Sequence, residues 1–301
     1  MEVFITGGTG YIGRAVVAEL SHAGHHVVAL NRSPDKIPLL NALGAAAHTG
    51  DLLQPQTYRD VAVSADAVIH AGFDYTSVLD ADRLALDVLL GAITGREAAL
   101  IYTSGLWVVG ETGGKVLGDD APTDRPASIV EWRVPHEAAV RRAAENGARA
   151  TVLRAGYVYG GAGGLFAKMF QTAVDDGAAH HVGDGDNHWS VVHVEDLARL
   201  YRLVAEKRAA GVVQAVDGTP MPLRDIAAAV SRAAGAEGRT KPIPLDVAVD
   251  RMGAKARAMA LDQRLSAPAA RALGWVPRYA SFADGAAAAF QEWKDSRTPV
   301  N

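Results

Sequence analysis

Short apolar segments of strand length alternate with longer segments of helical period over the first half of this 301-residue chain. Such alternation predicts parallel strands joined by crossover helices, with helices on both faces of the sheet. The expected strands are residues 3–5, 26–30, 45–49, 67–70, 99–102 and 151–154. The expected helices are residues 11–23, 34–43, a short segment after Pro55, 78–93 and 131–145. The sequence therefore predicts an α/β fold with a doubly wound parallel sheet of the Rossmann type.

The pattern is looser after residue 154, where a glycine-rich loop at 160–164 leaves the expected sheet. The elements expected beyond it are helices at 165–175, 196–206 and 282–293 and strands at 189–194 and 212–216. We expect a cofactor-binding Rossmann domain over 1–155, with 188–218 returning to it. A smaller, mostly helical substrate-binding part, interlaced with that domain, is expected over 156–187 and 219–301.

The composition excludes several classes of protein. Hydrophobic residues make up 49% and charged residues 21% of the chain, which is typical of a folded globular protein rather than a disordered one. The net charge of −4 disfavours nucleic acid and anionic membranes as partners, and the absence of cysteine excludes disulfides and thiolate chemistry. No apolar run is long enough to cross a bilayer, and the N-terminal segment lacks the pattern of a signal peptide. We expect a cytoplasmic protein.

A glycine-rich loop, Thr6-Gly7-Gly8-Thr9-Gly10-Tyr11-Ile12-Gly13, joins the first expected strand to the first expected helix. Glycines in this setting allow a tight turn and let backbone amides approach a pyrophosphate at the positive end of the helix. A glycine-rich turn without a ligand is the alternative, but the strand before the loop and the helix after it favour dinucleotide binding.

The end of the second expected strand indicates which dinucleotide is bound. An NAD site usually has an acidic residue here that binds the ribose hydroxyls, and its charge would repel a 2′-phosphate. This chain has Asn31 followed by Arg32, and Arg14 supplies a second cation in the first helix. A guanidinium binds phosphate in a bidentate fashion. The sequence favours NADP(H) over NAD(H), although both arginines could be solvated surface residues.

Several segments, taken in order, resemble the short-chain dehydrogenase/reductase superfamily in its extended and atypical forms. They are the TGxxGxxG loop at 6–13, Gly50-Asp51-Leu52, Val68-Ile69-His70-Ala71-Gly72, Ile101-Tyr102-Thr103-Ser104-Gly105, the segment 152–160, the "GDG…VHVxDLA"-like segments at 183–185 and 192–198, and Leu273-Gly274-Trp275-Val276-Pro277. The likeness is greatest to the NAD-dependent epimerase/dehydratase branch and covers essentially the whole chain. The resemblance implies that the cofactor is bound by Gly7, Gly10, Tyr11, Ile12, Gly13, Asn31, Arg32, Ser33, Asp51, Leu52, Ala71, Gly72, Ser104, Arg133 and Gly156.

The chain departs from this family at the catalytic motif. Working members use Tyr-x-x-x-Lys, in which the tyrosine exchanges a proton and the lysine holds the ribose. Alignment on Glu137 and Arg154 places Ile129 at the tyrosine position and Arg133 at the lysine position, and no other Tyr-x-x-x-Lys occurs in the chain. Arginine can bind a ribose hydroxyl but exchanges protons poorly, and isoleucine cannot exchange one.

Four residues remain as catalytic candidates: Ser104, Arg133, His136 and Tyr157. Ser104 lies one place before the position of the family's catalytic hydroxyl, so it either polarises a carbonyl or stabilises the turn. His136 lies three residues after Arg133 and has a pKa range suited to proton transfer, although a solvated role is the alternative. Candidates for substrate contact are Tyr75, Trp107, Tyr157 and His188, with simple packing as the alternative.

The expected activity is that of an NADP(H)-dependent oxidoreductase acting on a small carbonyl or hydroxyl compound. Two alternatives stay open: a cofactor-binding sensor or scaffold without catalysis, which loss of the tyrosine would explain, and a sugar-nucleotide epimerase or dehydratase. The pair His180-His181 has no carboxylate at ligand spacing, so we expect no metal site. A homodimer is left open.

Overall fold

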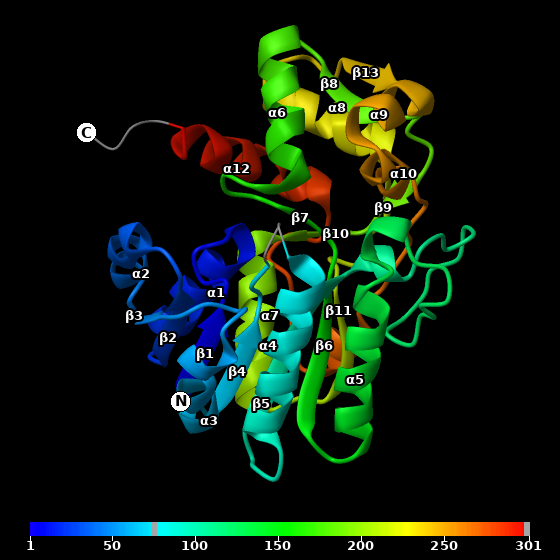
Figure 1. Ribbon diagram of the computed structural model, residues 1–301. Helices are drawn as coiled ribbons and strands as arrows, with labels where there is room; N and C mark the ends of the chain where they lie inside the picture. The colour runs from blue at the N-terminus through cyan, green and yellow to red at the C-terminus, as the bar shows by residue number, and fades with distance from the viewer. Residues whose placement is uncertain (74–76, 298–301) are drawn as a thin grey trace. The chain divides into compact units, whose positions relative to one another are not determined.

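The computed structural model describes residues 1–73 and 77–297. Its central sheet has seven strands in the order β11-β6-β5-β4-β1-β2-β3, and the pairs β1–β2, β1–β4, β2–β3 and β4–β5 are parallel (Figure 1). The strands are β1 (Glu2–Thr6), β2 (His26–Asn31), β3 (Ala45–Thr49), β4 (Ala67–His70), β5 (Ala99–Gly105), β6 (Arg149–Ala155) and β11 (Gly211–Ala215). The strand order reverses beside β1, which is the point where sheets of this kind bind ligands. The predicted doubly wound fold is confirmed.

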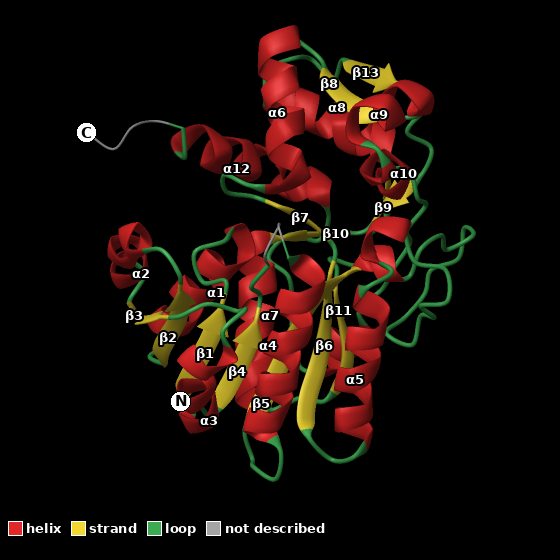
Figure 2. Ribbon diagram, viewed as in Figure 1, coloured by secondary structure: helices red, strands yellow, loops and turns green. Residues whose placement is uncertain are grey.

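Helices cover both faces of this sheet (Figure 2). They are α1 (Tyr11–His22), α2 (Ile37–Ala42), α3 (Arg59–Ser64), α4 (Val78–Ile93), α5 (Arg133–Glu145) and α7 (Val194–Lys207). On one face, Arg202 of α7 binds Glu19 of α1, with 2.8 Å between Nε and Oε1. On the other face, apolar side chains of α3, α4 and α5 pack in one core with the strands. Their burial against the sheet is the main source of stability for these helices.

The chain folds into two compact units, each assembled from three stretches of sequence. Unit 1 contains Met1–Ser104, Pro135–Leu153 and Leu197–Val213, and it holds most of the central sheet. Unit 2 contains Gly105–Val134, Arg154–Asp196 and Gln214–Asn301, of which the last four residues are not described. The two units therefore alternate along the chain.

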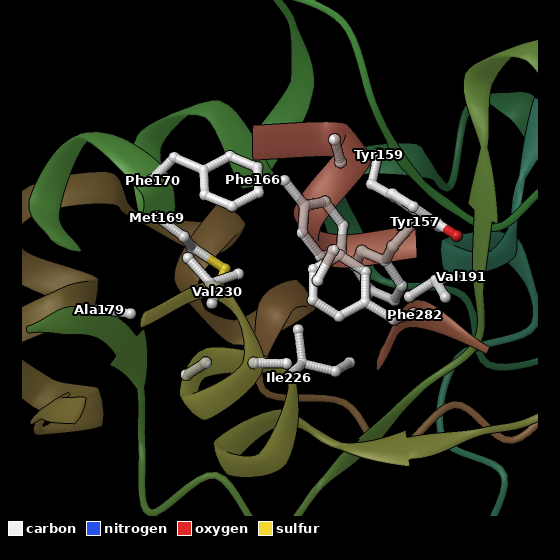
Figure 3. Close-up of a cluster of buried hydrophobic side chains, with 14 of the residues drawn as sticks. Tyr157, Tyr159, Phe166, Met169, Phe170, Ala179, Val191, Ile226, Val230 and Phe282 are labelled. Carbon is white, nitrogen blue, oxygen red and sulfur yellow. The ribbon is translucent and has the colours of Figure 1, made fainter. Parts of the chain in front are cut away.

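Unit 2 is built around an aromatic core that is shown in Figure 3. Its helices are α6 (Gly164–Asp176), α8 (Leu223–Ala233), α9 (Leu245–Met252), α10 (Ala254–Met259), α11 (Pro268–Ala272) and α12 (Phe282–Asp295). Its two-stranded sheets pair β7 (Tyr157–Tyr159) with β10 (Val191–His193), β9 (His188–Trp189) with β12 (Met221–Pro222), and β8 (Ala179–Val182) with β13 (Thr240–Ile243). Phe166, Phe170 and Phe282 are almost fully buried within this core.

The predicted strand at 189–194 is wrong in its extent. The segment divides at Ser190 into β9 and β10, which belong to two different sheets. The Ser190 hydroxyl accepts a bond from the Leu265 amide (2.8 Å) and donates one to the Gln263 carbonyl (3.0 Å). Helix α7 then begins at Val194, where His193 Nδ1 accepts a bond from the Glu195 amide (3.3 Å). The two bonds of Ser190 to Gln263 and Leu265, which are distant in the sequence, override the local strand pattern.

Within the described residues, no helix combines the length and the apolar character needed to cross a bilayer.

Candidate functional site

The glycine loop lies at the carboxyl end of β1 and is tightly packed against its own neighbours. Gly7 has φ +76°, and a Cβ on it would overlap the carbonyl oxygen of Ala71. A Cβ on Gly13 would overlap the carbonyl oxygen of Gly7, against which the first turn of α1 rests. Only glycine fits these two positions, because both are in contact with backbone rather than with movable side chains. The turn thus brings backbone close to the start of the helix, as the sequence predicts.

Helix α1 begins at Tyr11 with Gly10 as its N-cap, so no side chain caps its first amides. The Gly10 amide donates to the Gly7 carbonyl (2.9 Å), which closes the turn before the helix. Uncapped amides at the positive end of a helix dipole form a site for an anion. The loop therefore fits the pyrophosphate of a dinucleotide, which Gly7, Gly10, Tyr11, Ile12 and Gly13 would hold.

The end of β2 and the segment after β3 meet next to this loop in unit 1. Asn31 is buried and donates through Nδ2 to the Ser33 carbonyl (2.7 Å), while its own carbonyl accepts from the Gly50 amide (3.1 Å). The exposed Arg32 guanidinium lies 3.9 Å from the Asp51 carboxylate. Arg32 and Asp51 therefore lie close together, and the sequence predicts that both bind the cofactor. Arg14 lies in the first turn of α1, where its amide bonds to Gly10.

The segment after β4 closes the same region. The Gly72 amide donates to Thr6 Oγ1 (3.0 Å), and a Cβ on Gly72 would meet both Thr6 and Leu52. Ala71 also donates its amide to the Thr6 carbonyl (3.2 Å). The predicted cofactor residues Leu52, Ala71 and Gly72 therefore surround the end of β1. Tyr75, predicted to contact the substrate, lies outside the described residues.

A buried chain of polar side chains begins at Thr6, directly before the glycine loop. Thr6 Oγ1 lies 2.7 Å from His70 Nδ1, and His70 Nε2 lies 3.1 Å from Asp82 Oδ1. An ionised carboxylate only accepts, so His70 donates through Nε2, and Nδ1 of its neutral ring accepts a hydrogen bond from the Thr6 hydroxyl. Thr6, His70 and Asp82 are each less than 5% exposed. This chain crosses from β1 through β4 to helix α4.

Two further side chains converge on the other oxygen of Asp82. Tyr102 of β5 donates its hydroxyl to Oδ2 (2.6 Å), and His136 of α5 places Nδ1 2.7 Å from the same atom. Burial alone would raise the pKa of Asp82, but the hydrogen bonds from His136, His70 and Tyr102 outweigh it and hold the pKa well below its usual range. Asp82 is therefore a carboxylate that orients two histidines.

Ser104 stands at the carboxyl end of β5, two residues beyond Tyr102 and on the same face of the strand. Its side chain is 5% exposed, and its Oγ has no hydrogen-bond partner among the described residues. A buried hydroxyl without a partner is costly unless a ligand satisfies it. Thr103 points to the opposite face, where its hydroxyl bonds to that of Tyr201 (2.6 Å). Ser104 is thus available to a ligand at the edge of the sheet that carries the glycine loop.

The positions that correspond to Tyr-x-x-x-Lys lie at the start of α5. Ile129 is part of a short 3-10 turn (Ser128–Val130), and its carbonyl accepts a bond from Trp132 Nε1 (3.1 Å). Arg133, the first residue of α5, stacks its guanidinium over the Trp132 ring at 4.4 Å from the centroid. The start of this helix therefore presents a tryptophan and an arginine, and no tyrosine takes the family's place there.

Tyr157, a predicted catalytic and substrate residue, lies in the aromatic core of unit 2 (Figure 3). Its ring stacks on Trp189 with centroids 4.0 Å apart, and its hydroxyl accepts from Trp107 Nε1 (2.9 Å). The same hydroxyl lies 3.2 Å from Gln263 Oε1, to which it donates. Burial raises the pKa of Tyr157 well above its usual range. These contacts describe a packed and hydrogen-bonded tyrosine that gives up its proton reluctantly.

The remaining predicted residues in unit 2 are held by local contacts. His188 places Nδ1 3.1 Å from Asp262 Oδ1, and its amide donates to the same oxygen at 2.7 Å. Gly156 donates its amide to the Ala215 carbonyl (2.9 Å), and a Cβ there would crowd the Ser190 carbonyl. Trp107 bonds to Tyr157 as described. Unit 2 therefore gathers Trp107, Tyr157 and His188 around the segment 258–263.

The sequence motifs predict no catalytic or binding role for three polar residues of this region, which are Asp82, His70 and Tyr102. A signal for Asp82 exists: it shares a helix face with Leu86 and Leu89, four and seven residues later, and both leucines are buried. A carboxylate on an apolar helix face must find buried donors. The identity of those donors depends on the fold. Among the described residues, no group of three or more histidine, aspartate or glutamate side chains is arranged to hold a metal ion.

The sequence model of the NAD dependent epimerase/dehydratase family matches residues 3–216. The chain belongs to this family. An uncharacterized protein of Saccharomyces cerevisiae is 30% identical over 92% of this chain and 95% of its own length. The 2-alkyl-3-oxoalkanoate reductase of Stenotrophomonas maltophilia is 29% identical over 84% of this chain and 82% of its own.

The fold of this chain is also found among solved structures. A human epimerase family protein, crystallised with NADPH, superposes with a TM-score of 0.80 and covers 97% of this chain and 99% of its own, at 20% identity. This likeness establishes the Rossmann-type fold. The match of the family's sequence model over residues 3–216 confirms the family predicted from the sequence motifs.

Proposed function

We propose that this chain is an NADP(H)-dependent reductase of a small ketone. The observation that carries the proposal is Ser104, whose buried hydroxyl lacks a partner within the described residues at the sheet edge that also carries the glycine loop. A serine hydroxyl in this position can donate a hydrogen bond to a carbonyl oxygen and polarise it. The reductase named among the relatives supports a ketone as substrate.

A bound nicotinamide dinucleotide supplies the two electrons and one hydrogen that a carbonyl carbon needs to become an alcohol. The chain's own residues bind and orient the reactants. The glycine loop and the start of α1 would hold the pyrophosphate, and we assign to Arg133 the ribose hydroxyl that the family's lysine binds. Ser104 holds the carbonyl oxygen of the substrate. Positioning of this kind contributes substantially to the rate of a reaction between two bound reactants.

The preference for NADP(H) rests on Arg32. Its guanidinium is 65% exposed and stands 3.9 Å from the Asp51 carboxylate, so a 2′-phosphate can bind it from solvent. Replacement of Arg32 by serine is expected to weaken NADPH binding about tenfold or more and to leave NADH binding nearly unchanged. Arg83→Ser removes an exposed charge from α4 and is the matched control. Fluorescence titration measures both cofactors, and tighter binding of NADH by the unaltered protein would contradict the preference.

The reductase activity is tested by NADPH oxidation with a panel of ketones, including 3-oxoacids. Conversion of sugar nucleotides, which consumes no net NADPH in an epimerase or dehydratase, is followed by chromatography of the products. Turnover with a ketone supports the proposal. Turnover with a sugar nucleotide alone would favour an epimerase or dehydratase. Tight NADPH binding without turnover on any compound would favour the sensor or scaffold role instead.

A further inference from the structure

Among the described side chains of the hydrogen-bonded network, which are Thr6, His70, Asp82, Tyr102 and His136, the most exposed is His136. His136 is 14% exposed, whereas the side chains of Asp82 and His70 are 5% and 1% exposed. Tyr102 and Thr6 are fully buried. Of these side chains, His136 is the one that a ligand from solvent reaches most readily.

The network spans the carboxyl edge of three neighbouring strands. Thr6 ends β1, His70 ends β4, and Tyr102 pairs with His70 from β5. One end of the network thus adjoins the glycine loop. At the other end, His136 and Tyr102 share one oxygen of Asp82, and Ser104 follows Tyr102 on the same strand face. The geometry places a histidine and an unpartnered serine at the same side of the sheet edge.

The hydrogen bond from Asp82 also fixes which nitrogen of His136 carries the proton in the neutral ring. Asp82 only accepts, so His136 Nδ1 donates to it across 2.7 Å. The atom that exchanges a proton with a ligand is then Nε2. A carboxylate that orients a histidine in this manner sets the tautomer in which the other ring nitrogen can exchange a proton. An oriented histidine of this kind can exchange a proton, which is the role that the tyrosine has in other members of the family.

We propose that His136, oriented through Nδ1 by Asp82, donates the proton that completes reduction of the substrate's carbonyl. The inference rests on the proposed reductase function. As the carbonyl carbon is reduced, the N–H bond at His136 Nε2 breaks and an O–H bond forms on the former carbonyl oxygen. His136 becomes a neutral imidazole and regains its proton from water, so it is neither oxidised nor reduced. His136 is the catalytic residue, and Asp82 and His70 are positioning residues.

Substitution of His136 tests the catalytic role. His136→Gln is expected to lower kcat about 100-fold or more, with KM and the Kd for NADPH changed less than about threefold. Asp82→Asn is expected to lower kcat about tenfold with the same KM, because the ring loses its orientation. His22→Gln, an exposed histidine at the end of α1, is the matched control. Added imidazole is expected to restore part of the activity of His136→Ala, a result that a purely structural role does not predict.

A measurement without turnover tests the orientation. Nitrogen-15 NMR of the histidine rings is expected to show neutral His136 protonated at Nδ1, and Asp82→Asn is expected to shift the proton toward Nε2. Protonation at Nε2 in the unaltered protein would overturn the role of Asp82. Ketone reduction that His136→Gln retains within threefold would overturn the acid role alone. If the unaltered protein reduces no ketone, the reductase function fails and the acid role fails with it, while the NMR result still decides the orientation.

Discussion

Asp82 of unit 1 and Asp217 of unit 2 are buried to a similar extent, yet the pKa values of the two carboxyl groups are shifted in opposite directions. Asp82 in unit 1 is 4% exposed, and Asp217 in unit 2 is 5% exposed. Asp82 accepts from two histidines and a tyrosine, so its pKa lies well below the usual range despite burial. Burial raises the pKa of Asp217 to about 7, helped by Asp196 and Asp284. Its Oδ1 accepts from the Thr219 amide, and its Oδ2 has no partner among the described residues.

The difference shows that donors, and not depth, decide whether a buried carboxyl is charged. Unit 1 supplies donors from β4, β5 and α5 to one carboxylate and thereby orients His136 at the sheet edge. Unit 2 leaves buried polar atoms of Tyr159, Gln214 and Asp217 without a hydrogen-bond partner among the described residues. We infer that the polar groups of unit 1 serve chemistry and those of unit 2 serve packing. The following variants are ways to separate these two roles.

Removal of the Asp82 carboxylate should have the largest effect on stability. Asp82→Ala leaves the donors of His70, Tyr102 and His136 buried, and we expect a loss of about 3–5 kcal/mol in the free energy of unfolding at pH 7. Because the native pKa of Asp82 is lowered, its contribution is present above about pH 4 and is lost as the pH falls further. The variant should therefore approach the unaltered protein in strong acid. Urea unfolding measures this, with the exposed Asp87→Ala on the same helix as control. A loss below about 1 kcal/mol would show that the network is loosely held.

A pair of buried tyrosines gives the next largest effect. Tyr102 donates its hydroxyl to Asp82 across 2.6 Å, whereas the Tyr159 hydroxyl has no partner among the described residues. Tyr102→Phe should cost about 1.5–3 kcal/mol, the range for a hydrogen bond to a charged group. Tyr159→Phe should be neutral within about 0.5 kcal/mol or should stabilise, because it removes an unsatisfied hydroxyl. Equal losses in the two variants would remove the distinction between the units.

The pH dependence of stability tests the state of Asp217. Between about pH 4 and pH 7 the native protein holds a proton on Asp217 that the unfolded chain has released, so stability falls as the pH rises through this window. Asp217→Asn should abolish that fall and be more stable than the unaltered protein by about 1–2 kcal/mol at pH 8. Thermal or urea unfolding over pH 4–8 supplies the measurement, and the exposed Asp225→Asn serves as control. A variant whose pH profile parallels that of the unaltered protein would show that Asp217 is ionised in the native state.

Among the variants that remove a hydrogen-bonded group, Tyr157→Phe has the smallest expected effect. The change removes one hydroxyl that bonds to Trp107 and Gln263 and keeps the ring stacked on Trp189. We expect a loss of about 1 kcal/mol in stability and a kcat within about threefold of the unaltered protein. Steady-state kinetics measure kcat, and urea unfolding measures the change in stability. If kcat fell about 100-fold with stability unchanged, Tyr157 and not His136 would be the proton donor.

The cofactor loop could be predicted from the sequence because its signals are local. The strand, the glycines at 7, 10 and 13 and the helix follow one another directly, and the ends of parallel strands necessarily share an edge. The segments after β2, β3 and β4 therefore meet where the motifs indicate. The strand at 189–194 was mispredicted because Ser190 bonds to residues more than 70 positions away.

The orientation of His136 could not be predicted for the same reason. Asp82 is separated from His70, Tyr102 and His136 by 12, 20 and 54 residues, so no spacing in the sequence links them. The histidine was a candidate by its chemistry and its place near Arg133. The hydrogen bond from His136 to the Asp82 carboxylate is visible only in the folded structure. The same holds for the contacts of Tyr157 with Trp107 and Gln263 in the core of unit 2.

The most direct test of the central claim is the transfer of label from NADPH deuterated at C4 to the product of ketone reduction. The reductase function predicts one deuterium at the carbon that bore the carbonyl oxygen, observed by mass spectrometry, with a lower rate for NADH than for NADPH. Tight binding of NADPH with no labelled alcohol from any ketone would contradict it.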